Sequence, residues 1–331
     1  MTEPLTHILV LVEDGAVAFC HYENPSFHAS AKPRWMAEKR LRGIVRHAES
    51  QSVAVTFVLG NTKPPARIER LMQRVPHAKI VPLALGDVYP DAILVLDSED
   101  GDAFAQLSPD SRRNVILRLA RRDVAKGADL CASLAGRYGR LSLHLRGIEY
   151  FAPSDLAVYR EELARLGSML GKLYSGGDRF EINVLTDRMM LREMRNCDAG
   201  VKHVTVSPNG ECYICPAFVH DGEPIGRFDG AAGLAFKRIA GLDLSHGPLC
   251  TRCDAFHCKR CVYLSRKLTE EYNVPSEQQC AIAHIEREAS RLLLKDLGKV
   301  EPFRRMPRIA ELNYQDPIEL INGPPLEPAA P

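Results

Sequence analysis

The chain has 331 residues and a net charge of +1, with 45% hydrophobic and 26% charged residues, which is typical of a globular protein. A charge this small gives no general attraction to nucleic acid or acidic lipid, so neither is an expected partner. No apolar run approaches about 20 residues, and the first residues lack the basic and apolar segments of a secretion signal, so we expect a cytoplasmic protein that does not enter a membrane.

Strands and helices are expected to alternate over the first 190 residues. Hydrophobic patterning predicts strands over 8–12, 16–22, 53–59, 80–85, 92–96, 141–145 and 180–185, and a strand or helix start over 114–119. It predicts helices over 35–49, 67–75 and 124–138, and a long one that starts at an N-cap, Ser154. The long helix has an apolar stripe at Leu156, Tyr159, Leu163, Leu166, Leu170 and Leu173. Alternation of this kind predicts a mostly parallel sheet, as a partial barrel or an open doubly wound sheet.

Eight of the ten cysteines lie between Cys197 and Cys280. Two C-x-x-C clips, Cys250–Cys253 and Cys258–Cys261, are separated by only Asp254-Ala-Phe-His257. Thiolates are the ligands that zinc and iron–sulfur clusters prefer. Clips this close suit a single zinc poorly, whereas cysteines divided between two neighbouring iron–sulfur clusters fit the spacing better.

Local signals rank the cysteines. Asn209-Gly210 predicts a hairpin turn with Cys212 and Cys215 in its second strand, where residues three apart point to opposite faces. The two are therefore not expected to share a cluster unless the strand ends early, which Pro216 permits, and Cys212 is expected to be a small buried side chain. Ser276 and Gln279 form a capping box, which places Cys280 in the first helical turn, where a thiolate is stabilised.

Three other side chains have less specific signals. His284 lies one turn beyond Cys280 and could hydrogen-bond a cluster sulfur, although an ordinary half-buried histidine is favoured. Cys131 is expected to be packed in the core, and for Cys20 packing is favoured over the alternative that it is the remnant of a lost cysteine motif.

The cysteine pattern resembles a known family. Cys197, Gly210-Glu-Cys-Tyr-Ile-Cys215, the two clips and the distant Cys280 look like a SPASM domain, the auxiliary-cluster module of radical S-adenosylmethionine (SAM) peptide maturases, with both gaps inside the clip region one residue shorter. Longer stretches, among them Cys253-Asp-Ala-Phe-His-Cys-Lys-Arg-Cys-Val262 and Ala283-His-Ile-Glu-Arg-Glu-Ala-Ser290, resemble the CXXX-repeat peptide maturase family. The resemblance is dense over residues 185–295 and thin before them.

The resemblance implies two 4Fe–4S clusters. One would take Cys250, Cys253, Cys258 and Cys280, and the other Cys197, Cys215 and Cys261. The second set leaves one iron without a cysteine, and Cys212, Asp198, His203, water or a substrate thiol could fill that position. Zinc remains the alternative metal.

The same resemblance implies a degenerate radical-SAM-like partial (β/α) barrel over residues 1–190, a small cysteine-rich α+β SPASM-like domain over 191–300, and a Pro-rich tail over 301–331. Radical SAM enzymes carry C-x3-C-x2-C after the first strand, where this chain has Cys20 alone, and Gly-Gly-Glu-Pro after the second, where it has Gly60-Asn-Thr-Lys-Pro64. We therefore expect no autonomous cleavage of S-adenosylmethionine.

These expectations favour a maturation protein that binds a ribosomally made, cysteine-rich peptide of Cys-x-x-x units and works with a second maturation protein. Whether the chain is itself a catalyst stays open at this point. A stand-alone iron–sulfur redox enzyme and a zinc-stapled peptide-binding module without a redox role are the alternatives. Metal analysis separates the last of these from the others.

Overall fold

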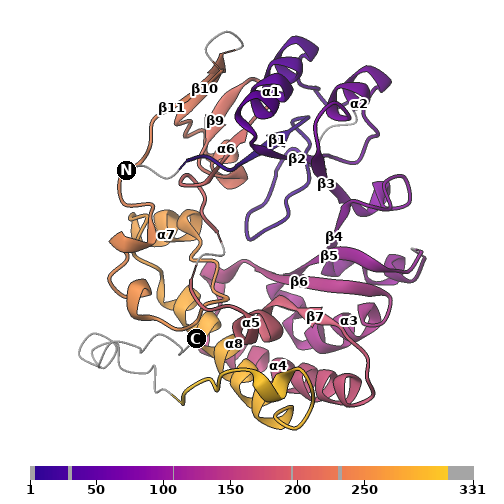
Figure 1. The fold of residues 1–331 in the computed structure, drawn as a ribbon, viewed down its shortest axis with the longest axis vertical. Coiled ribbons are helices and arrows are strands. Elements are labelled where there is room, and N and C mark those ends of the chain that lie inside the picture. Colours follow the sequence, from indigo (N-terminus) through magenta and orange to yellow (C-terminus); the bar gives the residue numbers. More distant parts are fainter. Residues whose placement is uncertain (1–3, 29–31, 107, 195–196, 230–232, 312–331) are drawn as a thin grey trace. The chain divides into compact units, whose positions relative to one another are not determined.

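The computed structural model describes residues 4–28, 32–106, 108–194, 197–229 and 233–311 (Figure 1). Its contacts divide the chain into two compact units: unit 1 is Met1–Leu96 with Asp198–Asp243, and unit 2 is Asp97–Cys197 with Leu244–Pro331. Both units are therefore assembled from two stretches of chain. The domain boundaries expected at residues 190 and 300 follow the family resemblance rather than these contacts, and they stay predictions.

Unit 1 is built on a mixed sheet with strand order β11-β10-β9-β8-β1-β2-β3-β4. The strands β8, β1, β2, β3 and β4 pair in parallel, each with the next in this order. The strands β8, β9, β10 and β11 pair antiparallel, each with the next. The strands are β1 (His7–Leu11), β2 (Ala54–Val58), β3 (His77–Pro82), β4 (Ile93–Asp97), β8 (His203–Val206), β9 (Glu211–Tyr213), β10 (Gly226–Asp229) and β11 (Gly233–Phe236). The helices are α1 (Glu38–Gln51), α2 (Ala66–Met72) and α6 (Pro216–Asp221).

Unit 2 contains a set of parallel strands and several helices (Figure 1), and the clip cysteines belong to this unit. Its strands are β5 (Asp110–Ala120), β6 (Tyr138–Arg146) and β7 (Glu181–Ile182), and its helices are α3 (Gly127–Leu134), α4 (Pro153–Ser175), α5 (Arg188–Met190), α7 (Val262–Thr269) and α8 (Glu277–Asp296).

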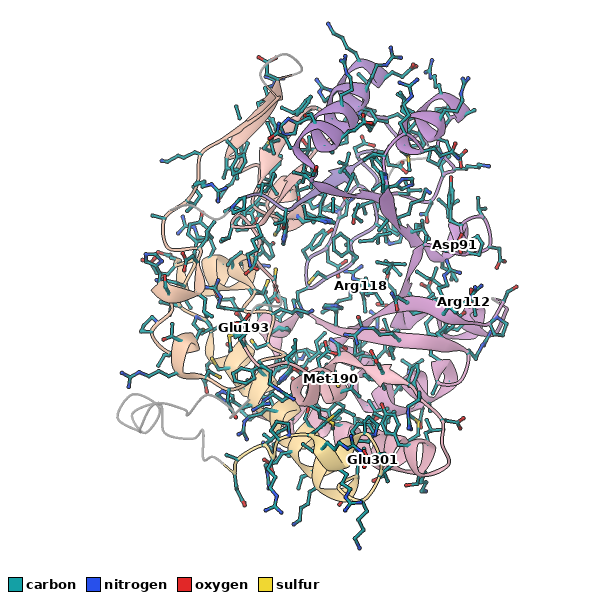
Figure 2. The ribbon with its side chains drawn as sticks, in the orientation of Figure 1. Asp91, Arg112, Arg118, Met190, Glu193 and Glu301 are labelled. Carbon is teal, nitrogen blue, oxygen red and sulfur yellow. The ribbon has the colours of Figure 1, made fainter. Side chains whose placement is uncertain are left out.

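The two faces of β5 and β6 differ in chemistry. Val115 pairs with Leu141 and Leu117 with Leu143, and all four side chains are buried, so one face is apolar. Arg118, labelled in Figure 2, pairs in register with His144 on the other face. The Arg118 side chain is 2% exposed, and its guanidinium lies 3.2 Å from the carboxylate of Asp97.

Helices α4 and α8 pack against each other in unit 2 (Figure 1). The expected stripe of α4 is buried at Tyr159, Leu163, Leu166 and Leu170, because these residues recur with the helical period on one face. Helix α8 buries Ile282 and Ile285 at the end that carries Cys280. The packing of these two helices thus positions the cysteine-bearing end of α8.

The predicted alternation of strands and helices with a parallel sheet is confirmed, although the strand expected over 80–85 ends at Pro82 and the helix expected over 124–138 ends at Leu134. Three further local predictions were wrong. Residues 16–22 form no strand, because the Asn24 side chain binds the carbonyls of Asp14 and Ala16. The strand expected over 180–185 ends at Ile182, because the Asn183 side chain binds the backbone N–H and carbonyl of Leu143 in place of a strand partner.

The third wrong prediction is the start of α4. The helix begins at Pro153, one residue before the expected cap Ser154, and the Asp155 carboxylate accepts a hydrogen bond from the Ala152 N–H at 2.8 Å.

The beginning of the Pro-rich tail packs against the rest of unit 2: Ile309 is buried, and the Ala310 carbonyl accepts a hydrogen bond from Arg287. Residues 312–331 lie outside the described part. Among the described residues, no helix has the length and apolarity that crossing a membrane requires.

Candidate metal centre

The first clip and its linker are held in a compact turn. Cys250 begins a short 3₁₀ turn (Cys250–Arg252), and Cys253 follows it in extended conformation. The linker between the clips, Asp254 to His257, is largely buried, with Asp254 5% and His257 6% exposed. Cys258 closes the linker, and Cys261 is the residue directly before α7.

Helix α8 brings the fourth cysteine to this turn. Its N-cap is Ser276, whose side-chain oxygen accepts a hydrogen bond from the Gln279 N–H at 3.2 Å, which is the first half of the expected capping box. The Gln279 side chain, expected to bind the Ser276 N–H, is instead paired with the Ser265 hydroxyl. Cys280 therefore sits in the first turn of the helix, as expected. The cap fixes the direction in which the chain enters α8 and so the place of the Cys280 side chain.

Four thiols converge in unit 2: Cys250, Cys253, Cys258 and Cys280. A negative charge on any one of them would raise the pKa of the others, since every pair of the four is close enough to interact. Burial, ahead of this mutual repulsion, raises the pKa values of Cys253, Cys258 and Cys280 to about 12. The thiols are thus protonated at neutral pH until a metal displaces their protons.

The high pKa of Cys280 corrects one expectation. The positive end of α8 was expected to stabilise its thiolate, but desolvation by burial outweighs this effect. Cys250 shows the same balance: burial raises its pKa, and the nearby Arg260 guanidinium only partly opposes the shift.

The spacing of the sulfurs distinguishes between candidate metals. A tetrahedral zinc ion at about 2.3 Å from each thiolate requires sulfurs about 3.8 Å apart. Among the described residues, no three of these four sulfurs lie within 4.8 Å of one another. In a 4Fe–4S cluster each thiolate binds a different iron, so the sulfurs stand farther apart. The set fits a cluster better than a single zinc ion.

Backbone N–H groups point at two of the sulfurs. The Ala255 N–H donates to Cys253 Sγ at 3.4 Å, and the Arg260 N–H donates to Cys258 Sγ at 3.3 Å. Arg260 has a left-handed backbone with φ of +43°, and this conformation accompanies its contact with the sulfur two residues earlier. Such hydrogen bonds stabilise negative charge on a ligand sulfur and tune the reduction potential of a bound cluster.

His284 also contacts the site. A hydrogen bond from His284 to a cluster sulfur was the less favoured of the two roles expected from the sequence. Its Nε2 lies 3.7 Å from Cys253 Sγ. Burial, with the nearby Arg287 charge, lowers its pKa to about 4, so the ring is neutral at pH 7. The four-residue spacing from Cys280 was the available signal, because residues four apart share a helix face.

The four thiols line one cavity of about 900 Å³ within unit 2. Its wall also includes apolar residues of the first turns of α4, such as Leu156, and charged residues of both signs: Arg160, Arg260, Arg287, Glu277 and Glu288. This volume lies within the range of small-molecule and cofactor pockets. The cavity thus gives an approach to the thiols.

The second predicted ligand set is distributed over both units. Cys197 and Cys261 belong to unit 2, whereas Cys215 belongs to unit 1 and directly precedes α6. Their joint role as ligands stays a prediction. Cys212 lies in β9 and is 0% exposed, and Cys131 is likewise buried, as expected for packed side chains. Cys20 is only partly buried.

No protein-family model matches the chain, and no curated protein sequence matches it. Solved structures do. Hexahistidine-tagged anSMEcpe with bound AdoMet is similar with a TM-score of 0.57 at 13% sequence identity, over 91% of this chain and 97% of that one. Native anSMEcpe with bound AdoMet and Cp18Cys peptide gives a TM-score of 0.55 at 12% identity, over 89% and 99%.

A third similar structure is Streptococcus suis SuiB bound to precursor peptide SuiA, with a TM-score of 0.46 at 13% identity, over 85% of this chain and 76% of that one. The likeness to anSMEcpe confirms the predicted fold class, an α/β fold with a parallel sheet that resembles those of radical SAM enzymes. At sequence identities this low, the likeness to anSMEcpe shows the fold alone. The finer resemblance to CXXX-repeat peptide maturases stays a prediction.

Proposed function

We propose that this chain is a maturation protein for a ribosomally synthesised, cysteine-rich peptide and that it carries a 4Fe–4S cluster on Cys250, Cys253, Cys258 and Cys280. The observation that carries the proposal is the convergence of these four thiols on one cavity, with no three of their sulfurs, all in the described part of the chain, within 4.8 Å of one another. When bound, such a cluster would supply one-electron transfer. The chain's own residues hold the cluster, donate N–H groups to its thiolate ligands and leave it reachable from the cavity.

Two further observations support a peptide as the partner. The cavity wall is mixed, with apolar side chains of α4 beside arginines, and this suits a chain that presents side chains and backbone carbonyls together. Two solved structures of the same fold hold peptides, named Cp18Cys and Kp18Cys. A peptide would reach the cluster through the cavity, with the cluster as the redox partner of the peptide or of a second maturation protein.

The proposal includes a second 4Fe–4S cluster on Cys197, Cys215 and Cys261, with one iron not bound by these cysteines. A cysteine of the peptide is a suitable fourth ligand, because a thiolate is a better donor to ferric iron than water is. Cys212, Asp198 and His203 are the competing ligands within the chain. The family resemblance, rather than geometry, carries this part.

Metal analysis after anaerobic purification tests the proposal. We expect iron with acid-labile sulfide and little zinc. Zinc without sulfide would favour the zinc-stapled binding module and contradict the cluster proposal. A Cys-x-x-x peptide should then bind and change the EPR spectrum of the protein, while the matched Ser-x-x-x peptide should not change it. Clusters without any peptide binding would favour the stand-alone redox enzyme instead.

A further inference from the structure

The linker between the two clips is anchored by polar side chains at both ends. Its first and last residues, Asp254 and His257, are both nearly inaccessible to solvent. Each side chain meets a charged residue of helix α8, and these two residues, Glu286 and Arg287, are consecutive in that helix. Both contacts lie within unit 2.

The Asp254 end is held by two arginines. The Arg287 guanidinium binds it with two hydrogen bonds, Nε to Oδ1 at 2.6 Å and Nη2 to Oδ2 at 2.7 Å. Arg188 of α5 adds a third bond to Oδ2 at 2.8 Å, and its guanidinium lies 4.5 Å from the centre of the Phe256 ring. Two parallel hydrogen bonds between a guanidinium and a carboxylate fix the relative orientation of the two groups as well as their distance.

The His257 end is held through Glu286. Glu286 Oε2 lies 3.2 Å from His257 Nε2, a close contact that lacks hydrogen-bond geometry, and Glu286 Oε1 accepts a hydrogen bond from the Tyr159 hydroxyl of α4 at 2.7 Å. Helix α8 packs beside both α4 and α5 (Figure 1). The linker is therefore tied to three helices, one of which carries Cys280.

Resting on the cluster proposed above, we propose that Asp254–Arg287 and His257–Glu286 are positioning contacts that set the metal selectivity of the four-thiol site. The linker separates Cys253 from Cys258, and α8 supplies Cys280, so the two contacts together fix three of the four ligands relative to one another. Because the contacts involve no metal, they hold the sulfurs apart before any metal binds. No three of the sulfurs, which all belong to described residues, lie within 4.8 Å of one another, so gathering them around one zinc ion at about 3.8 Å would require the anchored linker to move relative to α8.

A positioning role accounts for the burial of charged side chains at this linker. A buried ion pair costs desolvation and often adds little net stability compared with apolar packing. At Asp254 the benefit is geometric, because three directional hydrogen bonds hold this end of the linker in one orientation, which apolar contacts alone would not do. Residues around metal ligands commonly change metal affinity by about 10- to 100-fold when they are altered.

The first test uses wild-type protein alone. Hydrogen exchange is measured on the metal-free protein, prepared anaerobically, and on the protein reconstituted with iron and sulfide. We expect the amides of residues 254–258 and of the first turns of α8 to be protected in both. If these amides exchange freely until the metal is added, the site folds around its metal and the proposal fails.

The second test compares Asp254→Asn, Glu286→Gln and wild type, with Lys267→Gln as the control, since Lys267 forms a more exposed ion pair with Glu149 in the same unit. Each protein is reconstituted with iron and sulfide, and each metal-free form is titrated with Zn²⁺ against a chelating dye. We expect the linker variants to hold less cluster and to bind zinc about tenfold more tightly than wild type and control.

The outcomes separate this inference from the cluster proposal. Unchanged zinc affinity and cluster content in Glu286→Gln would overturn the positioning role while leaving the cluster in place. Wild-type protein that takes up zinc rather than iron and sulfide would overturn the cluster itself. If Asp254→Asn fails to fold, the positioning role is still tested by Glu286→Gln and by hydrogen exchange of the wild-type protein. Both of these keep the Asp254–Arg287 contact.

Discussion

Glu13 shows how a single side chain can join two strand ends. It follows β1 in unit 1 and is 2% exposed, and its Oε1 accepts a hydrogen bond from the Gly60 N–H beyond β2 at 2.6 Å. A Cβ at residue 60 would clash with the Gly15 carbonyl oxygen, so only glycine fits there. Burial raises the pKa of Glu13 to about 7, although the hydrogen bond from Gly60 opposes the shift.

This pKa predicts a pH-dependent stability that Glu13→Gln removes. The folded protein keeps the proton up to about pH 7, whereas the unfolded chain releases it near the ordinary pKa of 4.5. The free energy of unfolding therefore falls as pH rises through this window, by roughly 3 kcal/mol at most. Glutamine keeps an acceptor for Gly60 but does not titrate, so the variant should lose this slope and be more stable than wild type at pH 8.

Urea unfolding at pH 5 and pH 8 measures the effect. Asp14→Asn is the matched control, because Asp14 adjoins Glu13 but has a lowered pKa: burial would raise it, and the contact with Arg34 outweighs burial. We expect the control to retain the slope assigned to Glu13. Equal slopes in wild type and Glu13→Gln would show that the proton is held elsewhere.

The cysteines give a second prediction at the residue scale. Cys253→Ala should lose one cluster, whereas Cys212→Ala should keep nearly the full iron content, because Cys212 is fully buried in β9. Iron and sulfide are measured per chain after anaerobic reconstitution, with Cys131→Ala as a second packed-cysteine control. If Cys212→Ala loses as much iron as Cys253→Ala, then Cys212 is a ligand after all.

Among single residues, the clip cysteines and the Ser276 cap could be read from sequence because their signals are local. The partners of the linker could not. Asp254 and Arg287 are separated by 33 residues, and Arg188 lies 66 residues before Asp254. Neither spacing matches a helix or strand period, so only the packing of α5 and α8 reveals the contacts.

Helix α8 allows a prediction at the scale of one element. Ser276→Ala removes the acceptor for the Gln279 N–H and should lower the free energy of unfolding by about 1 kcal/mol. Ser276→Asp should restore most of it, since aspartate caps helices as well as serine does. Because Cys280 lies in the first turn, the alanine variant should also release its cluster faster.

Chemical denaturation of the metal-free protein and loss of visible absorbance on exposure to a chelator measure these two effects. Ser168→Ala is the matched control, since that exposed hydroxyl binds a carbonyl within α4 and caps nothing. Stability and cluster release that are the same in Ser276→Ala and in the control would exclude a role for the cap.

Elements differ in how far the sequence determines them. The stripe of α4 and the apolar strands were predicted because hydrophobic periodicity extends over many residues. The strand expected over 180–185 was not, because one polar side chain, Asn183, takes the hydrogen bonds of Leu143 and ends β7 early. Periodicity contains no information about such a competing side chain.

At the scale of the whole molecule, the sequence predicted the alternation of strands and helices better than the grouping of its parts. Unit 1 joins residues before 97 to residues 198–243, and unit 2 joins the segments that remain. Parallel pairing of β1 with β8 produces this arrangement, since the two strands are about 200 residues apart in the chain. Local patterns cannot specify a pairing at that separation.

The fold and the sequence together predict that the chain does not cleave S-adenosylmethionine by itself. The fold resembles those of radical SAM enzymes, but a cluster with one open iron needs three thiolates on one loop, and the segment after β1 offers Cys20 alone.

Anaerobic incubation of the reconstituted protein with dithionite and S-adenosylmethionine should give no 5′-deoxyadenosine above a no-enzyme background, with or without the Cys-x-x-x peptide. A known radical SAM enzyme in a parallel reaction shows that the reductant and cofactor are competent. The Cys253→Ala variant identifies any trace product made through the cluster of unit 2, because such product would fall with its iron content. Multiple turnovers by the wild-type chain would contradict the prediction and require an initiating cluster with ligands other than three cysteines on one loop.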